Sequence, residues 1–300
     1  MGHHLNYIYD KIDTLSPVHG RKLKKNLEFF DSRYHELADA FFDKYIPLLQ
    51  LENKTLDYSI DCYLHIVDDV NNETIEFLRT GKYTSSTFNE VNNRVYARPE
   101  IMEYYMHGLI MSQFLWRHHY QMFNYFIETL PKYTGQVKNY LEVGVGHGFY
   151  LSKALEILDN ATAVTAVDIS ETSIEMAQNF VNDSRVAYKL KNIFDFNNDE
   201  KYDFITLGEV LEHMEDPLTL LLKLSEFLGD DGTLFFTTPT NAPAIDHIYL
   251  FNNIREIQGV VKAAGFRIDS EMSFLSKDVP PEKAEKHKIT ELYGAFLKKM

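Results

Sequence analysis

Apolar residues recur at helical spacing through the first 130 residues of the chain. Two long stretches show this pattern most clearly, LKKNLEFFDSRYHELADAFFDKYIPLL from Leu23 and PEIMEYYMHGLIMSQFLWRHHYQMFNYFIETL from Pro99. Such spacing predicts amphipathic helices. The segment RTGKYTSSTFNEVNN between them is rich in Gly, Ser, Thr and Asn, which predicts a loop. Residues 1–130 are therefore predicted to form an all-helical N-terminal domain.

The pattern changes after a break at PKYTGQ, residues 131–136. Short apolar runs then alternate with amphipathic segments, which indicates repeated strand–helix–strand units and a mostly parallel sheet. Residues 131–300 are therefore predicted to form a second domain, of the α/β class. The predicted strands are NYLEVGV, ATAVTAVDI, RVAYKL, YDFITLG, GTLFFTTP, FRIDSEMSFL and LYGAFLKKM, with SKDVPPEKAEKHK as a polar insertion between the last two.

Composition and charge narrow the classes of partner. The chain has 300 residues, of which 45% are hydrophobic, and this length suits two ordinary domains. Its net charge of −14 repels phosphate backbones, so nucleic acid is not an expected partner. No apolar run reaches about 18 residues and the first residues lack the order of a signal peptide, so we expect a cytoplasmic protein without a membrane partner. The single cysteine, Cys62, excludes an intrachain disulfide framework.

Three glycines follow the first predicted strand at alternate positions, in EVGVGHG: Gly144, Gly146 and Gly148. In an open parallel sheet, ligands bind beyond the carboxyl ends of the strands. Glycine permits a positive φ and close approach of a ligand to the main chain, and the following helix offers free N–H groups. The turn is therefore a candidate ligand cradle. The alternative is a tight turn without a ligand.

Two further strand ends carry candidate ligand groups. Asp168 ends the second strand, where an acidic side chain can accept both hydroxyls of a ribose. The alternative for Asp168 is to cap the helix ETSIEMAQNF, a role for which Ser170 competes. The third strand ends near Asn192, whose amide could recognise an adenine edge while Ile193 packs on the ring.

The fourth strand leads into GEVLEHMEDP, and the chain now resembles the class I S-adenosylmethionine-dependent methyltransferases, in the E-x-x-x-H-x-x-D-P branch of the ubiquinone-type O-methyltransferases. The resemblance runs from Lys138 to Met300 through LEVGVGHG, AVDIS, KNIFDF, GEVLEHMEDP, DGTLFFTTP, DHIYLF and VVKAAGF. It implies a Rossmann-like sheet of seven strands, mostly parallel with an antiparallel last strand, and helices on both faces. A dinucleotide-dependent dehydrogenase shares the glycine turn and the acid but does not predict GEVLEHMEDP.

The resemblance also implies a set of residues for binding S-adenosylmethionine. An acid in the first strand orders the loop near the methionine amino group, the glycines form the cradle, and the end of the fourth strand lines the methyl group. Asp168 with Ile169 lies at the ribose and adenine, and the next strand supplies the adenine-edge pair. The implied residues are Glu142, Gly144, Gly146, Gly148, Asp168, Ile169, Asn192, Ile193, Leu207 and Gly208.

Acids and histidines after the fourth strand are the candidate catalytic residues. If a helix begins here, Glu209, Glu212 and His213 project from one face. They resemble the metal-binding E-x-x-E-H of small-RNA 2′-O-methyltransferases, and His247 could complete a site for Mg, Mn, Fe or Zn. The alternative is a metal-free helix in which His213 is a general base or positions the substrate.

A second candidate cluster, in the helical half, consists of Trp116, His118, His119 and Tyr120. Helices that precede the core in this class often cover the acceptor, and these side chains would suit a flat acceptor. The alternative is that the aromatic residues belong to the core. We expect one of the two histidines to face the site, and the sequence does not say which.

The expected function is methyl transfer from S-adenosylmethionine to a small molecule, at oxygen, with nitrogen or carbon as alternatives. Three other functions stay open: an RNA 2′-O-methyltransferase with a Glu/His metal site, a peptide methyltransferase, and a regulatory protein that binds the cofactor without catalysis. The aromatic helical half could also provide a homodimer contact.

Overall fold

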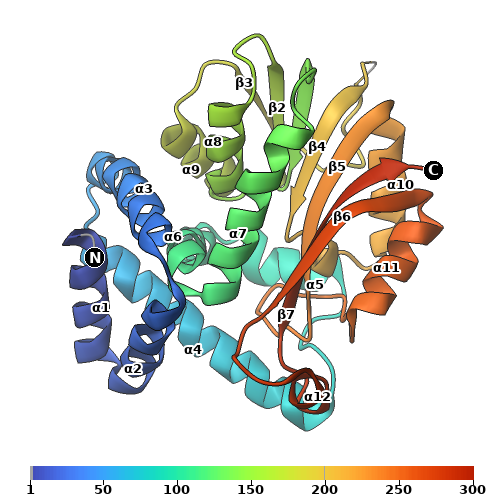
Figure 1. Ribbon diagram of the computed structural model, residues 1–300. Helices are drawn as coiled ribbons and strands as arrows, with labels where there is room; N and C mark the ends of the chain where they lie inside the picture. The colour runs from blue at the N-terminus through green and yellow to red at the C-terminus, as the bar shows by residue number, and fades with distance from the viewer. Residues whose placement is uncertain (1–2, 199) are drawn as a thin grey trace.

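The computed structural model describes residues 3–198 and 200–300 (Figure 1), so residues 1 and 2 of the predicted helical domain lie outside the description. The described residues before the first strand are helical, as predicted. The elements are α1 (His3–Leu15), α2 (Pro17–Asn26), η1 (Leu27–Phe29), α3 (Ser32–Leu51), α4 (Leu56–Thr80), α5 (Phe88–Val91), η2 (Asn92–Tyr96), α6 (Pro99–Leu115), α7 (Arg117–Thr129) and η3 (Leu130–Lys132).

Local signals divide the two long helical stretches. The first breaks at Phe30, which is extended, and Asp31 then caps α3 by accepting a hydrogen bond from the backbone N–H of Tyr34 at 3.2 Å. The second breaks at Trp116, whose backbone is extended between α6 and α7. The predicted loop after α4 is only partly a loop, because a capping box starts α5 within it and the π-helix η2 follows.

The second half contains one seven-stranded sheet in the order β3-β2-β1-β4-β5-β7-β6. Strand β7 pairs antiparallel with β5 and β6, and the pairs among β1 to β5 are parallel. This confirms the fold expected from the resemblance, including the antiparallel last strand. The strands are β1 (Asn139–Val143), β2 (Ala163–Asp168), β3 (Val186–Leu190), β4 (Tyr202–Gly208), β5 (Leu228–Thr240), β6 (Phe266–Leu275) and β7 (Glu291–Lys299).

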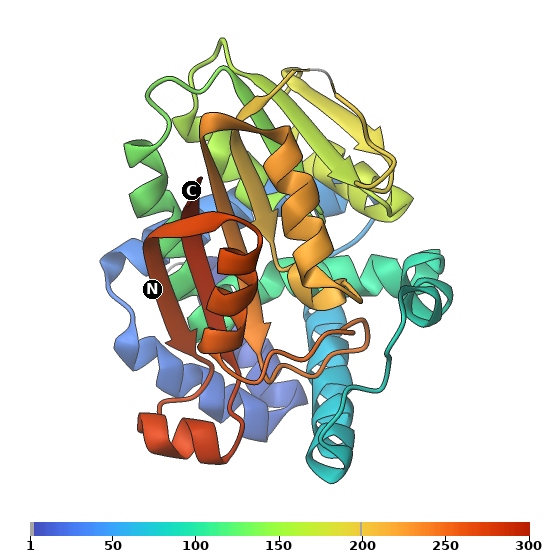
Figure 2. The ribbon, with the colours of Figure 1, turned by 90° about the vertical axis from the view of Figure 1, so that its right-hand side faces the viewer.

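Helices cover both faces of the sheet (Figures 1 and 2). On one face lie α7, α8 (Phe149–Ile157) and α9 (Glu171–Val181). On the other lie α10 (Pro217–Phe227) and α11 (Ile254–Ala263), while the short α12 (Pro281–Lys286) occupies the polar insertion before β7. Successive side chains of a strand point to opposite faces, so Phe204 joins the core of the first face and Ile205 joins that of the second.

The core of the first face continues into the helical half. Phe114 of α6 is fully buried and contacts Phe41 of α3, Phe123 of α7 and Phe149 of α8. The same cluster of buried side chains includes Phe235 in the middle of the sheet. Residue 130 therefore separates a helical part of the chain from an α/β part, and the two parts share one hydrophobic core. The division into two domains stays a prediction. Within the described residues, no helix has the length and apolar character needed to cross a membrane.

Candidate functional site

A cavity of about 520 Å³ opens at the carboxyl ends of β1, β2, β3 and β4. The loops that follow these strands form one wall, and α6 and η2 of the helical half form the other. The strand-side lining comes from residues 142–147, 167–170, 191–194, 208–210 and 212–216. The helical side contributes mainly apolar and aromatic groups: Tyr96, Met102, Tyr105, Met106, Leu109 and Gln113.

The three glycines of the first turn have different tasks, although all three have positive φ values, of 69°, 51° and 76°. A Cβ on Gly144 would lie 2.5 Å from Cγ2 of Val210. A Cβ on Gly148 would lie 3.1 Å from Cα of Ala177, so this glycine lets α8 start close against α9. At Gly146 the nearest atom would be Sδ of Met106, at 3.9 Å across the cavity. Gly146 therefore leaves room for a ligand, and Gly148 is a packing position outside the lining.

Asp168 is tied to the glycine turn and is not the cap of the next helix. Its Oδ2 accepts a hydrogen bond from the N–H of Gly146 at 3.0 Å, and its Oδ1 accepts one from the N–H of Ser170 at 2.9 Å. The cap of α9 is Ser170, whose hydroxyl accepts from the N–H of Ser173. Burial raises the pKa of Asp168, and the backbone donors oppose that rise. Asp168 lines the cavity, and a carboxylate has more acceptor positions than these backbone donors use.

Glu142 and Gly208 also line the cavity, whereas Leu207 does not. Tyr140 donates a hydrogen bond to Oε2 of Glu142 at 2.8 Å, and burial raises the pKa of Glu142 to about 8. The side chain of Leu207 is fully buried in the core on the α10 side of the sheet. Leu207 lies one residue before the end of β4, and Gly208 is the residue at its end.

The predicted adenine residues lie together at one end of the cavity. Ile169 is 39% exposed and Ile193 is buried. Asn192 uses its Oδ1 to accept a hydrogen bond from the N–H of Phe194 at 3.0 Å, which leaves its amide N–H groups free to act as donors. This end can therefore accommodate a flat ring between two apolar side chains with one amide beside it.

Glu209 does not start a helix, so the predicted common face of three residues is wrong. Its φ is +51°, and its N–H donates to both the carbonyl oxygen and the hydroxyl of Thr237. The 3₁₀ turn η4 (Leu211–His213) begins only after this left-handed residue. As a result the Glu209 side chain turns toward the helical half, with Oε2 at 4.0 Å from Nε2 of His119.

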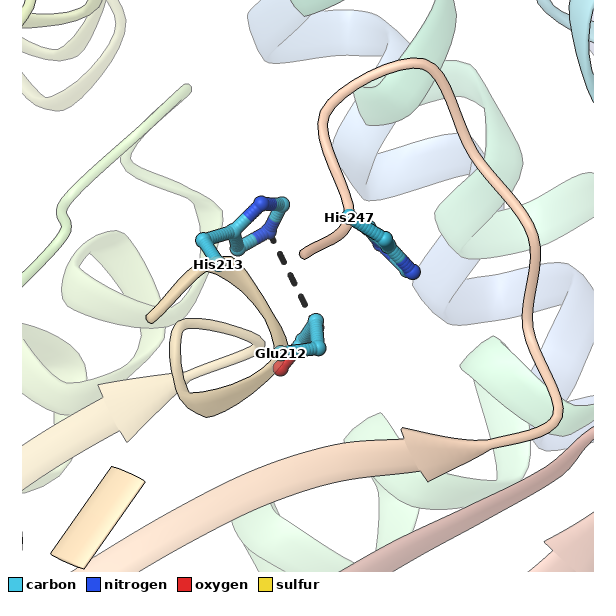
Figure 3. A group of neighbouring side chains, drawn as sticks. All are labelled: Glu212, His213 and His247. Atoms are coloured by element: carbon cyan, nitrogen blue, oxygen red, sulfur yellow. Dashed lines mark ion pairs between the residues drawn. The ribbon is translucent and has the colours of Figure 1, made fainter. Parts of the chain in front are cut away.

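Glu212, His213 and His247 form a compact group (Figure 3). One potential ligand atom from each residue lies within 4.8 Å of the other two. The first two come from η4 after β4, and His247 comes from the segment after β5. Oε2 of Glu212 accepts a hydrogen bond from Thr238 at 2.8 Å, while the buried Oε1 has no hydrogen-bond partner in the described part of the chain and lies 3.9 Å from Nε2 of His213.

Backbone carbonyls orient both imidazoles of this group. Nδ1 of His213 lies 2.9 Å from the carbonyl oxygen of Asp246, and Nδ1 of His247 lies 2.5 Å from that of Ala242. A carbonyl can only accept, so each Nδ1 carries its proton and each Nε2 is left for another partner. Burial lowers the pKa of His213, but the carboxylates of Asp246 and Glu212 outweigh it and the net pKa is raised. Burial lowers the pKa of His247 to about 4.

Of the four acceptor candidates, His119 lines the cavity. The indole N–H of Trp116 donates to the hydroxyl of Tyr63 at 2.9 Å, and the ring of His118 stacks on that indole. Tyr120 packs edge-on against Tyr34 within the core of the helical half. The break at residue 116 explains the split, because it sets the start of α7 so that only one of two adjacent histidines points inward.

The sequence did not predict the helical wall of the cavity. It also did not predict that acidic side chains dominate the lining of the whole cavity. Tyr105 donates to Oδ1 of Asp246 at 2.7 Å, and Tyr96 lies 2.9 Å from Nδ1 of His213. Tyr96 lies at the end of the π-helix η2. The hydrophobic pattern of the sequence does not reveal this π-helix, so it gave no indication that Tyr96 lies at the site. Carboxyl groups dominate the lining: Glu142, Asp168, Glu209, Glu212, Glu215, Asp216 and Asp246, against one lysine, Lys191, among the described residues.

Comparisons with known proteins agree with this geometry. The family model described as "Methyltransferase domain" matches residues 115–271, more than half of the chain. The ubiquinone biosynthesis O-methyltransferase of Actinobacillus pleuropneumoniae serotype 5b (strain L20) is 34% identical over 109 residues, covering 34% of this chain and 45% of that protein. The protein of that name from Coxiella burnetii (strain Dugway 5J108-111) is 35% identical over 104 residues, covering 34% and 43%. The chain thus spans less than half the length of these relatives.

Among solved structures, the N-methyltransferase NodS from Bradyrhizobium japonicum WM9 in complex with S-adenosyl-l-homocysteine aligns with a TM-score of 0.47 at 17% identity, covering 61% of this chain and 88% of that one. The residues that the family model matches contain the glycine turn, the acid at the end of β2 and the GEVLEHMEDP segment, in this order along the chain. The chain therefore belongs to the methyltransferase-domain family and is similar to the ubiquinone-type O-methyltransferases.

Proposed function

We propose that the protein transfers a methyl group from S-adenosylmethionine to a hydroxyl of a small-molecule acceptor. One observation carries the proposal: Gly146, which leaves space in front of its backbone, is hydrogen-bonded to Asp168 at the end of the next strand. A glycine at this turn lets a ligand approach the main chain, and an acid at this strand end can accept ribose hydroxyls, so the pair suits an adenosyl cofactor. Both lie in one cavity with the adenine end described above.

The residues present fit the cofactor along its length. Ile169 and Ile193 would hold the adenine with Asn192 at its edge, Asp168 would accept the ribose hydroxyls, and Glu142 would face the methionine end. Gly208, where a Cβ would meet no atom within 4 Å, leaves space near the reacting centre. When bound, S-adenosylmethionine supplies an already activated methyl group, so the main tasks of the protein are alignment and exclusion of water.

The helical wall supports a small and partly apolar acceptor. Its methionines and tyrosines face the glycine turn across the cavity, whose volume of about 520 Å³ is in the range of small-molecule sites. The net charge of −14 favours such an acceptor over RNA. Oxygen as the acceptor atom is supported by the names of the two relatives above, both of which are O-methyltransferases.

Asp168→Ala is expected to raise the Kd for S-adenosylhomocysteine about 100-fold, because hydrogen bonds to a charged group contribute about 1.5–3 kcal/mol each. Isothermal titration calorimetry on the purified protein measures it. The control is Asp195→Ala, which removes an exposed carboxylate from the loop after β3 and should leave the Kd unchanged. Equal Kd values for wild type and Asp168→Ala, or absence of binding by the wild type, would contradict the proposed cofactor site.

We also propose a divalent metal ion at Glu212, His213 and His247. Three observations support it: the ligand atoms are close together, both Nδ1 atoms are engaged by carbonyls, and Oε1 of Glu212 is buried without a partner in the described residues. Two imidazoles and one carboxylate form a donor set that suits Zn, Fe or Mn and leaves coordination positions for an acceptor oxygen. Glu209, part of the set expected from the sequence, lies beside His119 instead.

Glu212→Gln and His247→Asn are each expected to abolish stoichiometric binding of Zn²⁺ and Mn²⁺, because each removes one of three ligands. Calorimetric titration of chelator-treated protein, with elemental analysis after dialysis, measures it. His287→Asn, which alters an exposed histidine at the end of α12, is the control for adventitious binding. If both cluster variants bind metal as the wild type does, the three residues are not its ligands.

A further inference from the structure

The ring of His119 on α7 contacts Ser112 on the neighbouring helix α6. The hydroxyl of Ser112 on α6 donates to the carbonyl oxygen of Leu109 at 2.7 Å, and the same oxygen lies 2.9 Å from Nδ1 of His119. A hydroxyl has one proton, and here the carbonyl takes it. With its proton directed to the carbonyl, the Ser112 oxygen can accept a hydrogen bond from His119, an arrangement that places the ring proton on Nδ1 and leaves a lone pair on Nε2.

Nε2 of His119 faces the cavity, where it meets Glu209. The distance of 4.0 Å between Nε2 and Oε2 of Glu209 is too long for a direct hydrogen bond. It leaves room for one guest oxygen about 2.8 Å from both atoms, and a hydroxyl in this place can donate its single proton to Nε2. The left-handed backbone of Glu209, held by two hydrogen bonds to Thr237, fixes the carboxyl group in this place.

We infer that His119 is the general base of the transfer and that Ser112 and Glu209 are its positioning residues. This assignment rests on the proposed function. The acceptor hydroxyl lies between Nε2 of His119 and the Glu209 carboxyl group. Its oxygen forms the new bond to the methyl carbon as the carbon–sulfur bond breaks. The electron pair of that bond goes to sulfur, and the hydroxyl proton goes to Nε2.

Two other histidines near the site have ring nitrogens engaged by neighbouring groups. Burial and the neighbouring rings of His118 and His147 lower the pKa of His119 well below its usual value, so the ring is neutral and its Nε2 carries a lone pair in the arrangement above. Nε2 of His213 faces Glu212 in the proposed metal group. Nδ1 of His147 already accepts the N–H of Phe149 at 3.3 Å, and its ring belongs to the glycine turn. The lone pair of His119 is the one aimed at an acidic partner across open space.

Nitrogen NMR of the protein saturated with S-adenosylhomocysteine tests the tautomer without an acceptor. Long-range ¹⁵N–¹H correlation spectra are expected to show His119 with a protonated Nδ1 and an unprotonated Nε2, assigned from the signals lost in His119→Asn. Ser112→Ala is expected to shift this ring toward the other tautomer. A protonated Nε2 in the wild-type complex would overturn the inference while leaving the proposed function intact.

Turnover with phenol and 1,2-dihydroxybenzene as probe acceptors tests the base itself. His119→Asn keeps a donor toward Ser112 but lacks the base, so kcat/KM is expected to fall about 10²–10⁴-fold. Its remaining rate should rise steadily with pH, because ionisation of the phenol then replaces the base. The control is His287→Asn, which alters an exposed histidine at the end of α12 and should keep both rate and pH profile.

Affinity for S-adenosylhomocysteine distinguishes a failure of the proposed function from a failure of the assignment of His119 as the base. His119→Asn is expected to bind it as tightly as wild type, since His119 lies on the acceptor side. Failure of the wild type to bind contradicts the proposed function and this inference together. Binding by both proteins with equal turnover contradicts only the assignment of His119, because the cofactor site would then work without that base.

Discussion

Gly146→Val is expected to abolish binding of S-adenosylhomocysteine while the protein remains folded. A Cβ at this position enters the open space in front of the turn, where its first contact is Sδ of Met106 at 3.9 Å. The two methyl groups of valine would occupy the place proposed for the cofactor. The φ of +51° also disfavours a β-branched residue and would displace the N–H that bonds to Asp168. Calorimetry should show a rise in Kd of roughly 100-fold or more, about 2.8 kcal/mol.

Gly148→Ala is the matched control, because it adds a Cβ at an equally left-handed residue of the same turn. Its methyl group would meet Val181 at 3.0 Å and Ala177 at 3.1 Å, so it strains the contact between α8 and α9 by about 1–3 kcal/mol. We expect this variant to lower the melting temperature more than the affinity. If Gly146→Val binds normally and Gly148→Ala does not, the cradle has been placed at the wrong glycine.

Phe114→Ala is expected to destabilise the entire chain by about 3–5 kcal/mol, the range for removal of a buried aromatic ring. The ring is fully buried and joins side chains of α3 and α7 to Phe149 at the start of α8. Urea unfolding should be followed by fluorescence of the one tryptophan, Trp116, which reports on the helical half, and by far-ultraviolet circular dichroism, which reports on both halves. Both signals are expected to shift together to lower urea.

The control is Phe194→Ala, which removes a ring that is 37% exposed and should change stability little. Coincident transitions in the wild type and in Phe114→Ala would mean that the two halves unfold as one cooperative unit. If Phe114→Ala shifts the tryptophan signal and leaves part of the dichroism transition in place, the halves are independent, and residue 130 is a domain boundary in the thermodynamic sense.

The centre of the sheet could be predicted because β1, β4, β5 and β7 are buried along most of their length. Runs such as YDFITLG and GTLFFTTP are continuous apolar segments bounded by turn residues, a pattern that a helix of this length rarely shows. The helical half was harder to divide. The break at Trp116 depends on a bond to Tyr63, more than fifty residues earlier in the chain, and no local pattern encodes that partner.

The cavity residues at the strand ends could be predicted from the sequence. The cavity residues contributed by the helical half could not. Glu142, Gly146 and Asp168 have fixed places because a parallel sheet brings its carboxyl ends to one edge. Glu209 was misplaced because sequence spacing assumes helical backbone, whereas this residue is left-handed. The choice between His118 and His119, and the presence of Tyr96 and Tyr105 at the site, depend on how α6 and α7 pack. Such packing comes from many weak contacts and leaves no motif.

The acidic lining of the cavity bears on how product leaves. S-adenosylmethionine carries a positive sulfonium, whereas S-adenosylhomocysteine has an uncharged thioether at the same atom. Burial, with the charge of Glu212, raises the pKa of Glu209, and a cation placed among such carboxyls relieves both the burial cost and the repulsion. On the proposed function, we expect the donor to bind more tightly than the spent molecule. Transfer of the methyl group would then remove a charge that favours binding, so the reaction would weaken the hold on its own product.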